Sequence, residues 1–133
     1  MKRALAVVAV FFIVFYASFG CTPSVHLFLY NHSESELRLN DAGGEEVLRS
    51  EATREVRLSS SLRLYRGDEL LEYRIPKIPM EFWRYTTDGF YEVRLQIEPS
   101  AQIYLLGTAE MVPLKDLTNQ PTGFPMIPSA GSN

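Results

Sequence analysis

The chain has 133 residues and a formal net charge of −3, from 13 lysines and arginines against 16 aspartates and glutamates. Binders of nucleic acid carry clustered basic surface, so a mildly acidic chain predicts no nucleic-acid partner. Cys21 is its one cysteine, which excludes an intramolecular disulfide and a cysteine-rich metal site.

The first 20 residues have the composition of an export signal. Lys2 and Arg3 precede a largely apolar run over residues 4–17, and Gly20 stands directly before Cys21. A basic start, a short apolar centre and a small residue at the cleavage point are the parts of a secretory signal peptide. Removal of residues 1–20 would leave enough chain for one domain with one core.

This segment resembles the signal peptide of bacterial lipoproteins, in which the cysteine after the cleavage point is acylated and becomes the first residue of the mature chain. Gly20 fits that pattern, whereas Ser18 stands where leucine is usual and Phe19 is bulkier than is typical. The resemblance implies a lipid anchor at Cys21. Thr22 follows, in place of the aspartate that retains such proteins at the inner membrane, so the implied location is the outer membrane, facing the periplasm. The alternatives are an uncleaved N-terminal anchor and a plain secretory signal that is cut elsewhere.

Residues 21–116 are predicted to form the folded domain, because their apolar residues recur with a period of two. In the longest run, 91–97, apolar side chains alternate with charged and amide side chains. The alternation is typical of antiparallel sheets with one face against a core and one in solvent. It predicts an all-β fold, an antiparallel β-sandwich of eight or nine short strands, with a small barrel as the alternative and no substantial helix. Shorter alternating runs cover residues 25–30, 36–39, 55–58, 62–65, 71–75 and 103–106.

Turn signals separate these runs. Asp88 and Gly89 predict a hairpin between residues 82–85 and 90–97, because glycine accepts the positive φ that short hairpin turns require. Pro76 and Pro79 interrupt the alternation, which predicts a crossover or an edge between them.

From residue 117 to residue 133 the chain changes character. Three prolines punctuate this tail and favour an extended backbone. Phe124, Met126 and Ile127 lie between or beside the prolines, and apolar side chains of this kind suit a strap laid across the domain. A free tail and a short motif for a partner are the alternatives.

The residues that carry chemistry do not form a catalytic or metal-binding pattern. His26 falls on the outward face of its predicted strand and His32 in a turn, and the chain has no further histidine. No serine lies in a GxSxG or SxxK motif, and the acidic residues lack the regular spacing of a calcium loop. The sequence therefore predicts a protein that is not an enzyme and that needs no metal and no cofactor.

Aromatic residues gather on both sides of the predicted hairpin turn. Alternation places Trp83 and Tyr85 on one strand face, opposite the face that carries Arg84. A two-layer fold does not easily bury both faces, so one set is a candidate ligand or partner surface, where rings stack on sugars or receive apolar peptide. The other interpretation is core packing under the C-terminal strap. The candidate surface comprises Trp83, Arg84, Tyr85, Tyr91 and Phe124.

Arginines alternate with glutamates on the outward strand faces, which predicts cross-strand ion pairs. Docking of an anionic glycan or lipid headgroup is the alternative use of these arginines. The function that the sequence favours is a lipid-anchored, non-catalytic binding or structural module of the envelope with an envelope protein or glycan as partner. A module that contacts glycan or peptidoglycan through the Trp83 group is the second hypothesis, and an enzyme is the third. The alternating pairs are Glu36 with Arg38, Glu55 with Arg57, Glu72 with Arg74, and Glu92 with Arg94.

Overall fold

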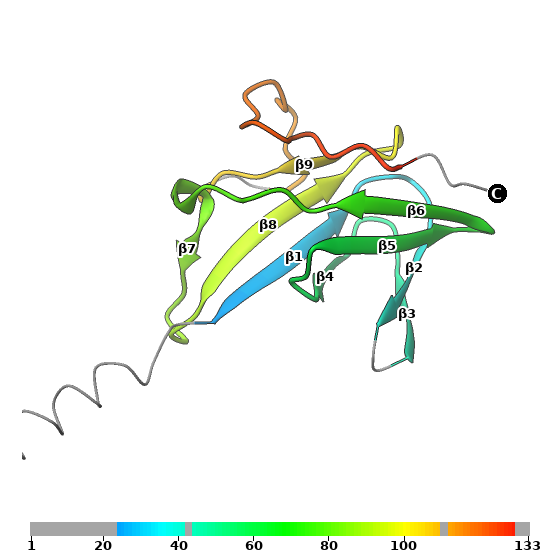
Figure 1. Cartoon of the computed structure of the whole chain (residues 1–133), viewed down its shortest axis with the longest axis horizontal. Helices are drawn as coiled ribbons and strands as arrows, with labels where there is room; N and C mark the ends of the chain where they lie inside the picture. Colours follow the sequence, from blue (N-terminus) through cyan, green and yellow to red (C-terminus); the bar gives the residue numbers. More distant parts are fainter. Residues whose placement is uncertain (1–23, 42–43, 110–111, 130–133) are drawn as a thin grey trace, which may run out of the picture.

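The computed structural model describes residues 24–41, 44–109 and 112–129, and this part of the chain folds as two packed sheets of nine strands (Figure 1). A single turn of 3₁₀ helix, η1 (Met80–Phe82), is the one helical element within those residues. The prediction of an all-β, two-sheet fold is confirmed, and the sheets do not close into a barrel. The strands are β1 (Val25–Asn31), β2 (Leu37–Asp41), β3 (Gly44–Leu48), β4 (Thr53–Val56), β5 (Ser61–Arg66), β6 (Glu69–Arg74), β7 (Arg84–Tyr85), β8 (Tyr91–Ile97) and β9 (Ile103–Leu105).

The first sheet has the order β4-β1-β8-β7, and β9 also pairs with β8. Its central pair, β1 and β8, is parallel over seven residues, from Val25 opposite Tyr91 to Asn31 opposite Ile97. This pair departs from the antiparallel arrangement that the alternation predicts. A parallel neighbour requires a long crossover, and here the intervening chain supplies it by forming the second sheet together with β4 and β7 of the first. Period-two alternation is the same for both strand directions, so the pattern does not reveal the difference.

The second sheet is antiparallel, with the order β3-β2-β5-β6. Its β5–β6 hairpin turns at Gly67, whose φ is +60°. Glycine adopts this left-handed conformation at little cost. The short hairpin keeps β5 and β6 in register from Ser61 opposite Arg74 to Arg66 opposite Glu69.

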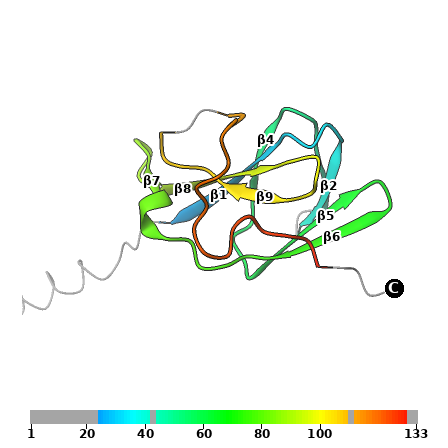
Figure 2. The same cartoon turned by 90° about the horizontal axis from the view of Figure 1, so that it is seen from above.

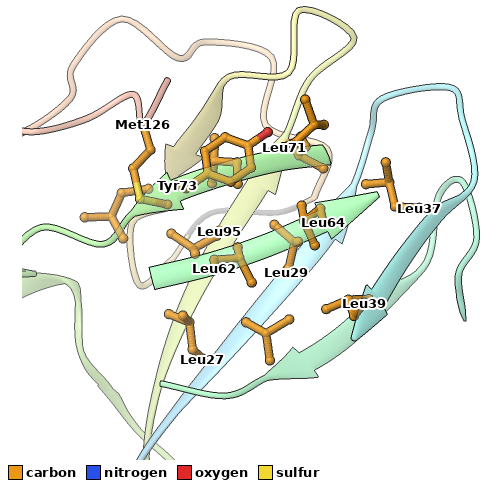
Figure 3. Packing of buried hydrophobic residues seen from close by; sticks show 14 of the residues in the cluster. Leu27, Leu29, Leu37, Leu39, Leu62, Leu64, Leu71, Tyr73, Leu95 and Met126 are labelled. Carbon is orange, nitrogen blue, oxygen red and sulfur yellow. The ribbon is translucent and has the colours of Figure 1, made fainter. Parts of the chain in front are cut away.

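The core lies between the two sheets and is built largely of leucine (Figure 3). Leu27 and Leu29 of β1 face Leu62 and Leu64 of β5, and all four are buried. Each such side chain stabilises the fold by about 1.5–3 kcal/mol relative to an exposed one. Beside them, the Tyr73 hydroxyl donates a hydrogen bond of 2.7 Å to the Ala101 carbonyl, which ties β6 to the β8–β9 turn of the other sheet.

The outer face of β8 is not fully in solvent. Gln96, which alternation places outward, is completely buried. Its amide oxygen accepts from the Leu114 N–H at 2.7 Å, and its amide nitrogen donates to the Leu114 carbonyl at 3.1 Å. The segment after β9 therefore folds over the outer face of β8. The Gln96 side-chain amide holds it there by pairing with the backbone of Leu114.

The C-terminal tail lies across the edges of both sheets. Ile103 of β9 exchanges two backbone hydrogen bonds with Met126, at 3.0 and 2.8 Å. Three residues later, the Ser129 N–H donates to the Glu72 carbonyl of β6 at 2.7 Å. Figure 2 shows this run from β9 toward β6. The described part of the tail is thus an ordered strap that joins the two sheets.

Candidate binding surface at the aromatic end

The candidate surface lies at the end of the sandwich where β1 and β8 begin. Figures 1 and 2 both place β7 and η1 at this end. The turn that precedes β8 has Gly89 at φ +87°, and the Thr86 N–H donates to the Phe90 carbonyl at 2.8 Å. The hairpin predicted at Asp88 and Gly89 is therefore confirmed.

Three aromatic rings pack together at this end. Tyr85 lies opposite Tyr91 in the β7–β8 register, and their ring centroids are 5.1 Å apart in an edge-to-face arrangement. Trp83 contacts Tyr91 in the same way at 5.9 Å. Tyr91 lies two residues before the buried Val93 and therefore points to the same face of β8, so the rings continue the inner face of the sheet. Trp83 and Tyr91 are half-buried, whereas Tyr85 is 62% exposed.

Arg84 occupies the opposite face of β7, as alternation predicts. It lies opposite Glu92 on β8, and the two side chains form an ion pair of 3.4 Å. Exposed pairs of this kind contribute about 0–1 kcal/mol. Arg84 therefore does not share a surface with Trp83 and Tyr85.

A pocket of about 260 Å³ opens beside Trp83. Its walls include Val25 from the start of β1 and Leu58 from the link between β4 and β5. The Trp83 Nε1 atom is buried and has no hydrogen-bond partner within the described ranges. A buried donor without an acceptor costs about 1–3 kcal/mol. The indole N–H is therefore an unsatisfied donor in a residue that lines the pocket. The remaining lining residues are Ser59, Ile75, Pro76, Lys77, Ile78 and Val93.

Phe124, which the sequence analysis includes in this surface, is buried in the structure. It is 8% exposed and lies in the core cluster together with Met126. The tail turns at this point, where the Phe124 N–H donates to the Pro121 carbonyl at 3.0 Å. The strap therefore directs the ring inward.

A second group of polar side chains, at the opposite end of the sandwich, is not evident from the sequence. The Tyr30 hydroxyl donates to the Glu51 carboxylate, and His32 Nδ1 lies 3.0 Å from both carboxylate oxygens of Glu98. His32 follows β1 and Glu98 follows β8, and they meet because these strands are parallel and in register. Only knowledge of that pairing could have predicted the contact.

The hydrogen bond to Glu51 has a measurable consequence for Tyr30. The carboxylate that accepts it raises the pKa of Tyr30 to about 12, and burial adds to the shift. The folded pKa then exceeds the unfolded value of about 10, so this stabilisation is complete below pH 10 and is lost as the pH rises toward 12. In an absorbance titration of tyrosine, Tyr30→Phe is expected to remove a late-titrating step. If Tyr30→Phe instead removes a step near pH 10 from the titration curve, Tyr30 titrates as an ordinary tyrosine and its hydrogen bond to Glu51 is contradicted.

The other candidate residues are engaged in local pairs. His26 lies on the outer face, with Nδ1 2.5 Å from Glu55 Oε1 and its ring 4.4 Å from that of Phe90. Cross-strand pairs join Arg38 to Glu45 at 3.3 Å, and Arg63 to Glu72 at 3.4 Å. In residues 24–41, 44–109 and 112–129, no three His, Cys, Asp or Glu residues are placed to hold a metal ion.

Within residues 24–41, 44–109 and 112–129, the length and apolar character that a membrane-spanning helix needs are not found in any helical segment. Comparisons with protein-family models, with curated proteins and with solved structures found no match to this chain.

Proposed function

We propose that the protein is a lipid-anchored, non-catalytic binding module of the bacterial cell envelope, held at the outer membrane and facing the periplasm. Its anchor is Cys21, which lies outside the described residues. Support comes from the basic and apolar segment before Cys21 and from its resemblance to a lipoprotein signal. The described body begins at Ser24, three residues after the cysteine, so anchor and domain are close neighbours.

The aromatic end is the proposed binding surface. The observation that carries this assignment is the pocket beside Trp83, whose buried N–H has no acceptor among the described residues. Neither histidine lines that pocket. His26 and His32 stand at opposite ends of β1, roughly 20 Å apart at the rise of a strand, and each lies next to a glutamate. This separation supports binding in preference to acid–base catalysis.

Glycan contact is the second candidate for this surface. The exposed Tyr85 ring offers a face on which a sugar could stack, and the pocket beside Trp83 lies next to this ring group. Arg84 is paired with Glu92, so the aromatic rings would carry most of such a contact.

The anchor is tested with a labelled fatty acid in bacteria that express the full chain. The wild-type protein is expected to take up the label, and Cys21→Ser is expected to lose it and to remain as unprocessed precursor or to be released in soluble form. Ser18→Leu is the matched control, because it restores the usual residue of the lipoprotein pattern and should retain the label. Unlabelled wild-type protein with Met1 still present would contradict the proposal.

A further inference from the structure

We propose that the aromatic end of the sandwich rests on the lipid bilayer, with Leu58, Met80 and Tyr85 at the boundary between headgroups and acyl chains. The inference rests on the proposed lipid anchor at Cys21. It goes further by making the bilayer surface itself the ligand of the aromatic end.

The length of chain between anchor and domain is the first argument. Three peptide steps separate Cys21 from Ser24, and an extended chain covers at most about 11 Å in that distance. The polar interface of one leaflet is itself roughly 5–8 Å deep. Ser24 is fixed to the sheet, because its carbonyl accepts a hydrogen bond of 2.9 Å from the Tyr91 N–H. An acyl chain in the membrane therefore holds the start of β1 and β8 at the headgroup layer.

The second argument is the apolar surface at this end. Leu58 is 48% exposed and Met80 is 72% exposed, and with Tyr85 they are three of the seven large hydrophobic residues that stand exposed in the described part of the chain. Each of the three is linked to Trp83 or to its pocket. Leu58 lines the pocket, the Met80 carbonyl accepts a hydrogen bond of 3.0 Å from the backbone N–H of Trp83, and Tyr85 belongs to the same ring group. Tryptophan and tyrosine are the aromatic residues that favour the membrane interface, since they combine an apolar ring with a polar group.

The exposed charges at this end have both signs, because Lys77 stands against Glu81 and against Asp88 in the turn before β8. Lys77 lines the pocket and can extend its ammonium group toward lipid phosphate. Glu81 is exposed beside Met80, while Arg84 and Glu92 neutralise each other. With both signs present, the contact depends mainly on apolar burial, so it should change little with ionic strength.

This arrangement also orients the domain. β1 runs away from the membrane for seven residues, roughly 20 Å at the rise of a strand. The polar group of Tyr30, His32, Glu51 and Glu98 is then at the end that faces the periplasm.

Trp83 is the one tryptophan in the chain, so its fluorescence reports on this end alone. The lipidated protein is reconstituted into vesicles of phosphatidylethanolamine and phosphatidylglycerol in which some lipids carry bromine on the first carbons of the acyl chain. We expect quenching of Trp83 emission and reduced access of aqueous iodide, compared with the protein in detergent. Raising the salt concentration should leave both effects unchanged.

Variants at the proposed contact provide the control. Leu58→Glu combined with Met80→Glu is expected to abolish the lipid quenching, while Leu70→Glu, at the far β5–β6 hairpin, should retain it. Circular dichroism verifies that each variant is folded.

The outcomes separate the two proposals. A purified protein without the mass of an acyl group overturns the anchor, and the membrane contact with it. An acylated protein whose Trp83 is not quenched by lipid overturns the contact alone. A shift of Trp83 emission with soluble peptidoglycan fragments but not with vesicles would overturn it in favour of glycan binding.

Discussion

Val93→Asp is expected to unfold the domain or to lower its free energy of unfolding by more than about 4 kcal/mol, because it buries a charge with no partner. Val93 is completely buried on β8, opposite Leu27 in the central parallel pair. The Val93 side chain borders the Trp83 pocket but has no exposed surface of its own, so a carboxylate at this position loses its hydration. Circular dichroism during urea titration measures the change, and the wild-type protein should give a β-dominated spectrum.

Val47→Asp is the matched control for this substitution. Val47 also lies on a strand, at the edge of the second sheet, but it is 38% exposed. A charge there remains hydrated, and we expect a change within about 0.5 kcal/mol. Equal effects at the two positions, or a strongly helical spectrum of the wild-type protein, would contradict the described fold.

The faces of the strands could be predicted from the sequence, but strand pairing could not. Alternation in residues 91–97 correctly places Val93 inside and Arg94 outside, since side chains alternate strictly along a strand. It carries no information on which strand lies next to which, or in which direction. The parallel contact of β1 with β8 was therefore missed, and with it the contact of His32 with Glu98.

The candidate surface could be predicted only in part, because alternation gives the faces of one hairpin but not the packing of distant segments. Trp83, Tyr85 and Tyr91 flank one hairpin, and local alternation is enough to gather their rings on one face. Phe124 and Gln96 depend on how the irregular segments after β9 dock. That docking uses single hydrogen bonds to backbone groups, such as those between Gln96 and Leu114, and these have no periodic signal in the sequence.

Deletion of residues 118–133 is expected to lower the melting temperature by removing two core side chains and the cover of two sheet edges. Phe124 and Met126 are both buried, and each contributes about 1.5–3 kcal/mol from burial before the entropy of ordering the tail is subtracted. The deletion also removes the hydrogen bonds of Met126 to Ile103 and of Ser129 to Glu72. In the sequence interpretation the tail covers Trp83, yet none of its described residues lines the pocket there. Trp83 emission should therefore shift only when the domain unfolds.

Gly123→Ala tests the packing of the strap by adding one methyl group. Gly123 has φ +91°, and a Cβ added there would lie 2.8 Å from the Pro76 Cβ atom, too close for a rigid proline ring to accept. Gly67→Ala is the matched control, because Gly67 also has positive φ, +60°, but no atom lies within 4 Å of its added Cβ. The left-handed backbone alone costs about 1–2 kcal/mol, so Gly123→Ala should lower the free energy of unfolding by clearly more than Gly67→Ala. Suppose that Gly123→Ala and Gly67→Ala have the same melting temperature and that the deletion leaves the melting temperature unchanged. The tail then does not stabilise the domain, and its assignment as a strap across the two sheets is wrong.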